Sequence, residues 1–260
     1  MLERITPVIL TYNEEANIER VLERLRWARD IVVMDSYSTD GTLSILERYP
    51  NVRCFQRKFD SHANQWNFAI TQTGIETDWI LALDADYVLT EKLVDELGSL
   101  AFNREVKGYS ASFLYCVFGK PLRGSLYPAV TVLYNKNFAA YVQDGHTQRI
   151  QIEGKVGSLK AEILHDDRKP LSSWLRAQDK YMDLEADIIS QSEFGSLGFN
   201  DCVRKLILPG PILTFFYCLL YKKGILDGWA GLFYATQRTV AEFILSMKLI
   251  QRKIALKEIK

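Results

Sequence analysis

The sequence predicts an α/β fold with a parallel sheet at its centre, because strands and helices alternate from the start of the chain. Residues 5–10 form a β-rich run, followed by a polar loop and by apolar residues at helical spacing. Residues 31–34 repeat this order, with a polar loop at 35–42 and a short helix at 43–49. Parallel sheets bind their ligands at the carboxyl ends of the strands. The loops after these strands therefore mark the expected site.

A pair of acidic residues follows a third predicted strand. The apolar residues 79–83 indicate a buried strand, and Asp84 and Asp86 come directly after it. Hard cations such as Mg²⁺ and Mn²⁺ bind oxygen ligands and complete their shell with water and substrate phosphate oxygens. The pair therefore indicates a metal site for a nucleoside diphosphate substrate. Two acids after a strand are also typical of a solvated turn or a helix cap.

Three motifs in order along the chain resemble glycosyltransferase family 2, the inverting nucleotide-sugar transferases with the glycosyltransferase A fold. They are TYNEE at 11–15, DSYSTDGT at 35–42 and DAD at 84–86. Residues 59–70 are similar to the helix after the third strand in WaaE-type lipopolysaccharide-core glucosyltransferases. The resemblance covers residues 5–90 best. It implies an α/β class with a Rossmann-like mixed sheet flanked by helices.

The resemblance also implies a site for a UDP-sugar. The first motif would surround uracil and ribose, the second would reach the base, and the third would meet the ribose hydroxyls. The residues assigned to the nucleotide are Thr11, Tyr12, Asn13, Glu14, Asp35 and Asp84. Asn67 is a further candidate for nucleotide binding, with helix capping as its alternative role.

An inverting mechanism needs a metal and a base. The resemblance implies that Asp86, with Asp84, binds a metal that stabilises charge on the departing nucleotide. The attacking hydroxyl needs a base within about 3 Å. Asp144 is the first candidate and His146 the second. Many family members have Glu-Asp or His-Glu near this place, whereas this chain has Asp-Gly-His-Thr, and Asp-Gly is also common in turns.

A dense polar cluster at residues 165–169 follows a strand-like segment. His165 could complete the metal shell, and Arg168 or Lys169 could neutralise diphosphate charge. In the alternative interpretation, Asp166 and Asp167 interact with the dipole of the following helix and the cations are solvated.

The later segments predict additions to the sheet and a connecting helix. Residues 108–118 and 130–134 are rich in Tyr, Phe, Val and Ser and predict antiparallel strands that shape the acceptor side. Pro170 suits the first position of a long helix, whose apolar face continues to residue 182. We expect this helix to link the sheet domain to the C-terminal segment.

The charge is unevenly placed and divides the chain at residue 199. Residues 1–199, the predicted catalytic domain, contain 22 Lys and Arg against 28 Asp and Glu, whereas residues 200–260 contain 10 against 4. Residues 206–221 are uncharged, but a spanning helix needs about 20 apolar residues. The pattern predicts an amphipathic helical extension on an anionic membrane, with a buried helix pair as the alternative. The cations expected at the head groups are Lys222, Lys223, Arg238, Lys248, Arg252 and Lys253.

The cysteines and the N-terminus favour a cytoplasmic protein. The four cysteines include no Cys-x-x-Cys pair, so neither a zinc site nor a disulfide framework is indicated. The chain enters its first strand without room for a charged leader and an apolar signal core, so we expect no secretion. The expected location is the inner face of a bacterial cytoplasmic membrane, with peripheral attachment.

The sequence thus predicts a metal-dependent inverting glycosyltransferase that uses Mn²⁺ or Mg²⁺. It would move a hexose from a UDP-sugar to a hydroxyl of a lipid-linked or lipopolysaccharide-core glycan. The sugar, the acceptor, the linkage and the oligomeric state are left open. No nucleic-acid partner is expected, because the basic residues interleave with an apolar tail instead of exposed stacking aromatics.

Two other function classes remain. A nucleotidyltransferase acting on sugar phosphates would need a Gly-rich basic loop after the first strand, which residues 11–15 lack. A non-catalytic membrane-associated scaffold could keep the sugar-nucleotide fold. The products distinguish the three, since a transferase releases nucleoside diphosphate, a nucleotidyltransferase releases pyrophosphate and a scaffold releases neither.

Overall fold

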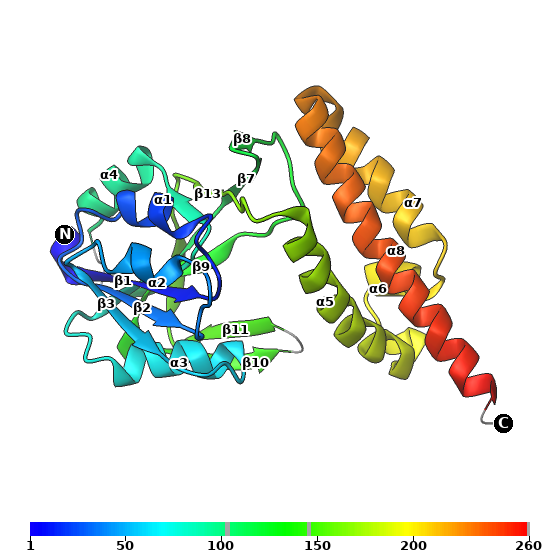
Figure 1. Ribbon diagram of the computed structural model, residues 1–260, viewed down its shortest axis with the longest axis horizontal. Coiled ribbons are helices and arrows are strands. Elements are labelled where there is room, and N and C mark those ends of the chain that lie inside the picture. The colour runs from blue at the N-terminus through cyan, green and yellow to red at the C-terminus, as the bar shows by residue number, and fades with distance from the viewer. Residues whose placement is uncertain (102–104, 145–146, 259–260) are drawn as a thin grey trace. The chain divides into compact units, whose positions relative to one another are not determined.

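The chain forms two compact units in the computed structural model, which describes residues 1–101, 105–144 and 147–258 (Figure 1). The first unit contains Met1–Gly119 and Tyr127–Arg168, and the second contains Lys120–Leu126 and Lys169–Lys260. This division differs from the predicted boundary at residue 199. The reason is that the helix before that boundary packs against the last helix of the chain.

A seven-stranded mixed sheet forms the centre of the first unit, in the order β12-β6-β9-β4-β1-β2-β3. β1 pairs in parallel with β2 and β4, and β2 with β3, whereas β9 is antiparallel to β4 and β6. The predicted antiparallel addition is therefore present for residues 108–111 and 130–134, whereas residues 113–117 pair in parallel with a later strand. The strands are β1 (Ile5–Thr11), β2 (Ile31–Asp35), β3 (Val52–Gln56), β4 (Trp79–Asp84), β6 (Val106–Ala111), β9 (Val130–Asn135) and β12 (Lys155–Ser158).

Helices cover both faces of this sheet (Figure 1). Neighbouring residues of a strand point to opposite faces, so the apolar runs of β1 and β4 supply two cores. Ile9 and Leu81 pack with the first set of helices, and Val8 and Ile80 pack with the opposite one. The helices are α1 (Ile18–Glu23), α2 (Thr42–Leu46) and α4 (Glu91–Ser99) on one face, and α3 (His62–Gln72) on the other.

Two smaller β elements complete the first unit. β13 (Ile163–His165) lies between β5 (Tyr87–Leu89), to which it is antiparallel, and β7 (Phe113–Val117), to which it is parallel. β10 (Ala139–Asp144) and β11 (Thr147–Ile152) form an antiparallel hairpin. Figure 1 shows this hairpin alongside α3, against which it packs.

The second unit is helical apart from the short strand β8 (Lys120–Pro121). Ala186 and Ile189 of α5 pack against Leu245 and Leu249 of α8. Among the described residues, no helix is both long and apolar enough to cross a membrane. The helical segments are α5 (Leu171–Gln191), the turn η3 (Phe194–Ser196), α6 (Phe199–Lys205), α7 (Pro209–Phe216), the π-helical turn η4 (Tyr217–Tyr221), the turn η5 (Gly224–Asp227) and α8 (Trp229–Glu258).

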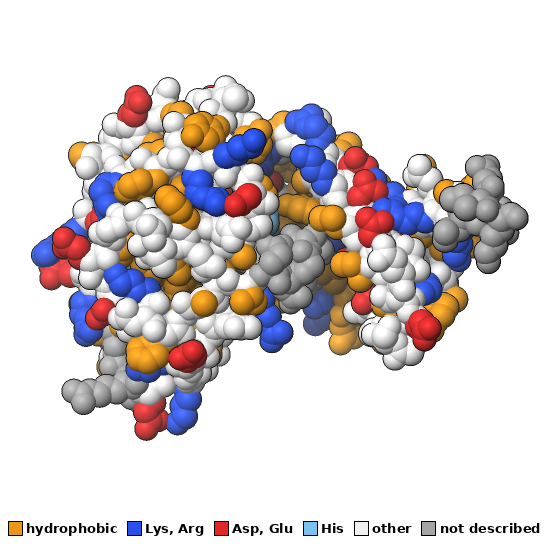
Figure 2. Space-filling view, turned by 90° about the horizontal axis from the view of Figure 1, so that it is seen from below, with side chains coloured by type: hydrophobic (Ala, Val, Ile, Leu, Met, Phe, Trp, Pro, Cys, Tyr) orange, Lys and Arg blue, Asp and Glu red, His pale blue; other side chains and the backbone are white. Residues whose placement is uncertain are grey.

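Ion pairs join α5 to α8, and Figure 2 shows acidic and basic side chains next to one another on the helical part. Lys248 lies 2.7 Å from Asp179, and Arg252 lies 2.8 Å from Asp187. Both cations were expected at lipid head groups. The structure instead pairs them with carboxylates of α5, so they are part of the helix packing.

Candidate active site

The three sequence motifs meet at the carboxyl edge of the central sheet, as predicted. In the strand register, Thr11 is the partner of Asp35, and Leu10 is the partner of Asp84. The loops after β1, β2 and β4 are therefore neighbours, although residues 11 and 84 are far apart in the sequence. This edge is the candidate site.

The Asp35 carboxylate holds these loops together from inside. Its Oδ1 accepts hydrogen bonds from Thr11 Oγ1 at 3.1 Å and Ser38 Oγ at 2.5 Å. Its Oδ2 accepts from Ser38 N at 2.9 Å and from Gln56 Nε2 at 3.3 Å. Asp35 is 0% exposed and Thr11 is 3% exposed. Both residues therefore support the loops, and their predicted direct contact with the nucleotide stays a prediction.

The first loop is joined to the second by backbone hydrogen bonds. Asn13 N donates to Ser38 Oγ at 2.8 Å, and Glu14 N donates to Thr42 Oγ1 at 2.8 Å. Asn13 Oδ1 accepts from Thr39 N at 2.8 Å. Asn13 also has a positive φ of 54°, a backbone conformation that non-glycine residues rarely adopt. The hydrogen bonds offset this strain and fix the shape of the rim.

Two exposed tyrosines lie on this rim. Tyr12 is 58% exposed and Tyr37 is 53% exposed, the latter with φ of 62°. An aromatic ring at a polar rim offers a face on which a base can stack. Tyr12 was predicted, whereas Tyr37 was missed. The sequence feature that could have indicated Tyr37 is its position as an aromatic residue inside an otherwise polar loop.

Asn67 clamps the β10–β11 hairpin to α3. Its Nδ2 donates to the Tyr141 carbonyl at 2.8 Å, and its Oδ1 accepts from Tyr141 N at 3.0 Å. The neighbouring Trp66 ring stacks on Tyr141 with 5.3 Å between centroids. Both polar atoms of the Asn67 side-chain amide thus bond within the protein. The structure therefore shows a positioning role for this residue, and its predicted contact with the nucleotide stays a prediction.

The structure brings His165 to Asp86. β13 pairs with β5 so that His165 is opposite Tyr87, and Asp166 N donates to the Asp86 carbonyl at 3.0 Å. His165 Nε2 lies 3.2 Å from Asp86 Oδ2. Burial lowers the pKa of His165, but the carboxylates of Asp86 and Asp84 outweigh it and leave the pKa above its ordinary value.

Aromatic rings surround the His165 imidazole. The ring centroids of Tyr127, Tyr115 and Tyr87 lie 4.4, 4.9 and 5.3 Å from that of His165. The hydroxyls of Tyr87 and Tyr127 are hydrogen bonded to each other. The buried Nδ1 atom of His165 has no hydrogen-bond partner among the described residues. The ring is therefore fixed in position while one of its nitrogens stays unused.

The fit of a metal ion can be tested on these atoms. Among the residues the structure describes, no three His, Cys, Asp or Glu side chains are arranged to hold a metal ion. Asp86 and His165 provide one oxygen and one nitrogen donor in contact, and Asp84 ends the adjacent strand β4. This donor set fits a cation that takes its other ligands from diphosphate and water.

Asp166 holds the loop after β13. Its carboxylate lies 2.5 Å from Arg20 and 2.9 Å from Arg168, and Oδ1 accepts from Gly119 N at 3.0 Å. Gly119 has φ of 81°, and a Cβ there would lie 2.7 Å from the Arg168 guanidinium. Asp166 therefore fixes Arg168, and the predicted alternative of capping α5 is not observed. Asp167 Oδ1 likewise accepts from Asn17 Nδ2 at 2.8 Å.

The first candidate base, Asp144, lies at the end of β10. Asp144 is the last residue of β10, where its backbone is the partner of Thr147. His146 lies outside the described residues. Their catalytic roles therefore stay predictions.

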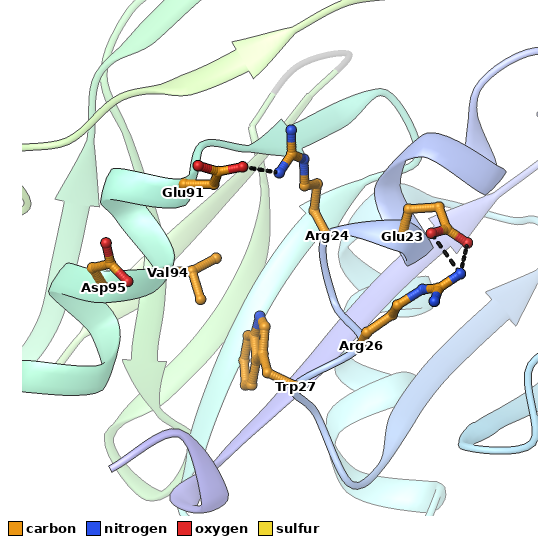
Figure 3. Close-up of a pocket in the computed structure, with 7 residues that line it drawn as sticks. All are labelled: Glu23, Arg24, Arg26, Trp27, Glu91, Val94 and Asp95. Carbon is orange, nitrogen blue, oxygen red and sulfur yellow. Dashed lines mark hydrogen bonds and ion pairs between the residues drawn. The ribbon is translucent and has the colours of Figure 1, made fainter.

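A separate pocket lies between the end of α1 and α4, and it contains none of the predicted site residues (Figure 3). Arg24 pairs with Glu91 across it at 3.0 Å. Arg24 follows the C-terminal end of α1, whereas the site loop after β1 precedes the N-terminal end of the same helix. The pocket is therefore not part of the candidate site.

The chain belongs to glycosyltransferase family 2, whose model, described as "Glycosyl transferase family 2", matches residues 6–146. The family prediction is confirmed. The lipopolysaccharide core biosynthesis glycosyltransferase LpsC of Rhizobium meliloti is 28% identical over 268 aligned residues, 95% of this chain and 92% of that protein. An uncharacterised glycosyltransferase of Rickettsia bellii is 31% identical over 147 residues, 54% of this chain and 49% of that protein. The chain thus spans about half the length of the latter.

A solved structure resembles the chain over most of its length. S. aureus TarS 1-349, in complex with UDP-GlcNAc, superposes with a TM-score of 0.50 at 14% identity, covering 96% of this chain and 92% of that one. At this identity the likeness concerns the fold alone. It agrees with the predicted mixed sheet of the glycosyltransferase A type with flanking and C-terminal helices.

Proposed function

We propose that the protein is a metal-dependent inverting glycosyltransferase that moves a hexose from a UDP-sugar to a hydroxyl of a lipid-linked or lipopolysaccharide-core glycan. The observation that carries the proposal is the contact of His165 with Asp86 beside the loops of the first two motifs. The name of LpsC supports the acceptor class, and the UDP-GlcNAc bound to TarS supports the donor class.

On the donor side, the exposed rings of Tyr12 and Tyr37 offer stacking faces for uracil. Asp84 at the end of β4 would accept hydrogen bonds from ribose hydroxyls. Arg168, held by Asp166 and 45% exposed at its side chain, would meet the diphosphate. Each group is attached to a loop that is already hydrogen bonded within the protein.

Asp86 and His165, with Asp84 beside them, would hold Mn²⁺ or Mg²⁺. When bound, the cation would stabilise charge that develops on the leaving diphosphate. The surrounding tyrosine rings keep the imidazole in place, and the Asp86 contact fixes its orientation. Ligands that are held in advance need no reorganisation when the substrate arrives.

On the acceptor side, we assign the base to Asp144, with His146 as the second candidate. A carboxylate that accepts the hydroxyl proton makes the acceptor a competent nucleophile for attack opposite the leaving group. Asp144 ends a strand whose Tyr141 is clamped by Asn67. The hairpin thereby ties the base to the rigid helix α3.

The loop after β1 argues against nucleotidyl transfer. A triphosphate is usually held by free backbone N–H groups of such a loop. Here the N–H groups of Asn13, Glu14 and Glu15 donate to side chains of the second loop. We therefore expect nucleoside diphosphate, and not pyrophosphate, as the released product.

A donor-binding measurement tests the proposal directly. Thermal denaturation with UDP should show a rise in melting temperature that increases when Mn²⁺ is added, because metal and diphosphate share one site. Incubation with UDP-hexose and a lipopolysaccharide-core acceptor should then release UDP, measured by a coupled assay. Pyrophosphate release, or no release with any UDP-hexose, would contradict the proposal.

The Asn67 clamp gives a second prediction. Asn67→Ala removes both hydrogen bonds to Tyr141, so we expect the transfer rate to fall by about 10-fold or more as the hairpin loses its position. UDP affinity should stay unchanged, because the hairpin lies on the acceptor side. Asn64→Ala, an exposed asparagine of the same helix, is the matched control. Equal losses in UDP affinity and in rate would show a general structural effect.

A further inference from the structure

Consecutive segments of the second unit, from α7 to the start of α8, carry exposed apolar side chains, which we call the α7–η5 surface. Its members from α7 and η4 recur at spacings of three and four residues, which places them on one side of the helix. The opposite side carries the buried residues Pro211 and Cys218. The members, between 43% and 86% exposed, are Ile212, Leu213, Phe216, Tyr217, Leu220, Tyr221, Ile225, Leu226 and Trp229.

Large apolar side chains gathered in this way usually mark a contact with a protein or a membrane. Charge decides between these partners. The second unit contains 15 Lys and Arg against 9 Asp and Glu, a net charge of +6. The only carboxylate between residues 206 and 241 is Asp227, which is 3% exposed and paired with Arg123. The α7–η5 surface therefore exposes no negative charge.

Two lysines at the edge of this surface are available for a ligand. Lys222 and Lys223 directly follow η4, and neither forms an ion pair with any residue that the structure describes. Lys222 lies 5.8 Å from the Tyr217 ring centroid. By contrast, Arg204, Lys248 and Arg252 are held by carboxylates of the same unit. Two adjacent lysines without ion pairs thus lie next to these apolar side chains in the chain.

We infer that the α7–η5 surface lies on an anionic lipid bilayer, with its apolar side chains among the acyl chains. Lys222 and Lys223 contact lipid phosphates, and Trp229 and Tyr221 lie at the level of the head groups. The inference rests on the proposed function, because a lipid-linked acceptor would be reached at the bilayer that this surface contacts. It also narrows the attachment to one face of the C-terminal segment.

A second apolar stripe on α8 provides an internal control. Phe243, Met247, Ile250 and Ile254 are exposed along one side of that helix. The nearby cations Lys248 and Arg252 are paired with α5, which leaves Lys253 as the neighbouring cation without an ion pair among the described residues, against two adjacent lysines at the α7–η5 surface. Equivalent substitutions in the two places therefore separate the bilayer surface from exposed apolar area in general.

The experiment is co-sedimentation of the full chain with vesicles of phosphatidylcholine, with and without phosphatidylglycerol, at low and high salt. We expect binding only with the anionic lipid, and weakening by salt. Lys222→Glu combined with Lys223→Glu should weaken binding by about 10-fold or more. Phe216→Ser with Leu220→Ser should weaken it similarly, whereas Phe243→Ser with Met247→Ser should leave it within about 2-fold.

Several results would overturn the inference. They are absence of wild-type binding to anionic vesicles, equal loss in the α8 control, or full binding by both α7–η5 variants. A dimer in analytical ultracentrifugation that Phe216→Ser with Leu220→Ser disrupts, without vesicle binding, would identify a second copy as the occupant. The lysine variant keeps the test valid if the apolar variant fails to fold, which circular dichroism would reveal.

The vesicle-binding result can be separated from the proposed sugar transfer. The lysine variant should release UDP from UDP-sugar by slow hydrolysis at the wild-type rate, because Asp86 and His165 belong to the other unit. Vesicle binding without any UDP release would retain the surface and reject the transferase. UDP release without vesicle binding would support the transferase and reject the α7–η5 surface as a bilayer contact.

Discussion

Asp86→Asn should lower sugar transfer by at least about 100-fold while the protein stays folded. A bound metal contributes several kcal/mol of charge stabilisation in the transition state, and about 1.4 kcal/mol corresponds to a factor of ten. The asparagine oxygen can still accept a hydrogen bond from His165 Nε2, now 3.2 Å from Asp86, so the β5–β13 pairing should persist. UDP release with acceptor, and the Mn²⁺-dependent part of the UDP thermal shift, are the measurements.

Asp95→Asn is the matched control for this change. Asp95 is an exposed carboxylate on α4 in the pocket of Figure 3, so the variant makes the same chemical change away from the site. It should keep wild-type turnover and the full metal-dependent shift. Near wild-type turnover in Asp86→Asn would reject the metal assignment, and equal loss in both variants would point to a general effect of charge.

The parallel part of the fold could be predicted because its signals are local. Apolar runs mark β1, β2 and β4, and polar loops after them indicate the site edge, so the register that joins Thr11 to Asp35 follows from the topology. The small sheet that contains β5, β13 and β7 was harder to predict from the sequence. β5 is only three residues long, and its antiparallel pairing with β13 depends on contacts that no local pattern displays.

The roles of individual polar residues were less predictable than their location. The resemblance implied that Asp35 meets the base, but it did not predict that this buried carboxylate also bonds to Thr11, Ser38 and Gln56. Asn67 reaches Tyr141, which is 74 residues further along the chain. A polar side chain at a sheet edge has several possible partners, and only packing decides which one it meets.

The partners of the charged residues in the C-terminal segment were likewise not predictable from the sequence. Counting residues gave the correct excess of cations, but counting does not reveal pairing. The carboxylates of α5 recur at a four-residue spacing and match Lys248 and Arg252 of α8. A boundary at residue 199 separated these partners, so the sequence analysis counted paired cations as available to lipid.

Asp144→Asn should lower transfer by about 100-fold or more and leave UDP-sugar affinity nearly unchanged. General bases typically contribute factors of about 10² to 10⁴, and the base touches the acceptor and not the donor. Asparagine preserves the side-chain size but cannot take up the proton. Turnover with acceptor and calorimetric titration of UDP-sugar with Mn²⁺ measure the two effects separately.

The matched variants are His146→Ala, which tests the second candidate, and Gln151→Ala, an exposed residue of the same hairpin. The glutamine variant should keep full activity, because β11 pairs with β10 through its backbone. Full activity in Asp144→Asn with an inactive His146→Ala would assign the base to the histidine. Full activity in both would mean that the acceptor hydroxyl is deprotonated elsewhere. Joint loss of rate and UDP-sugar affinity in Asp144→Asn would indicate that the hairpin closes on the donor, and that Asn67 positions a donor-binding element.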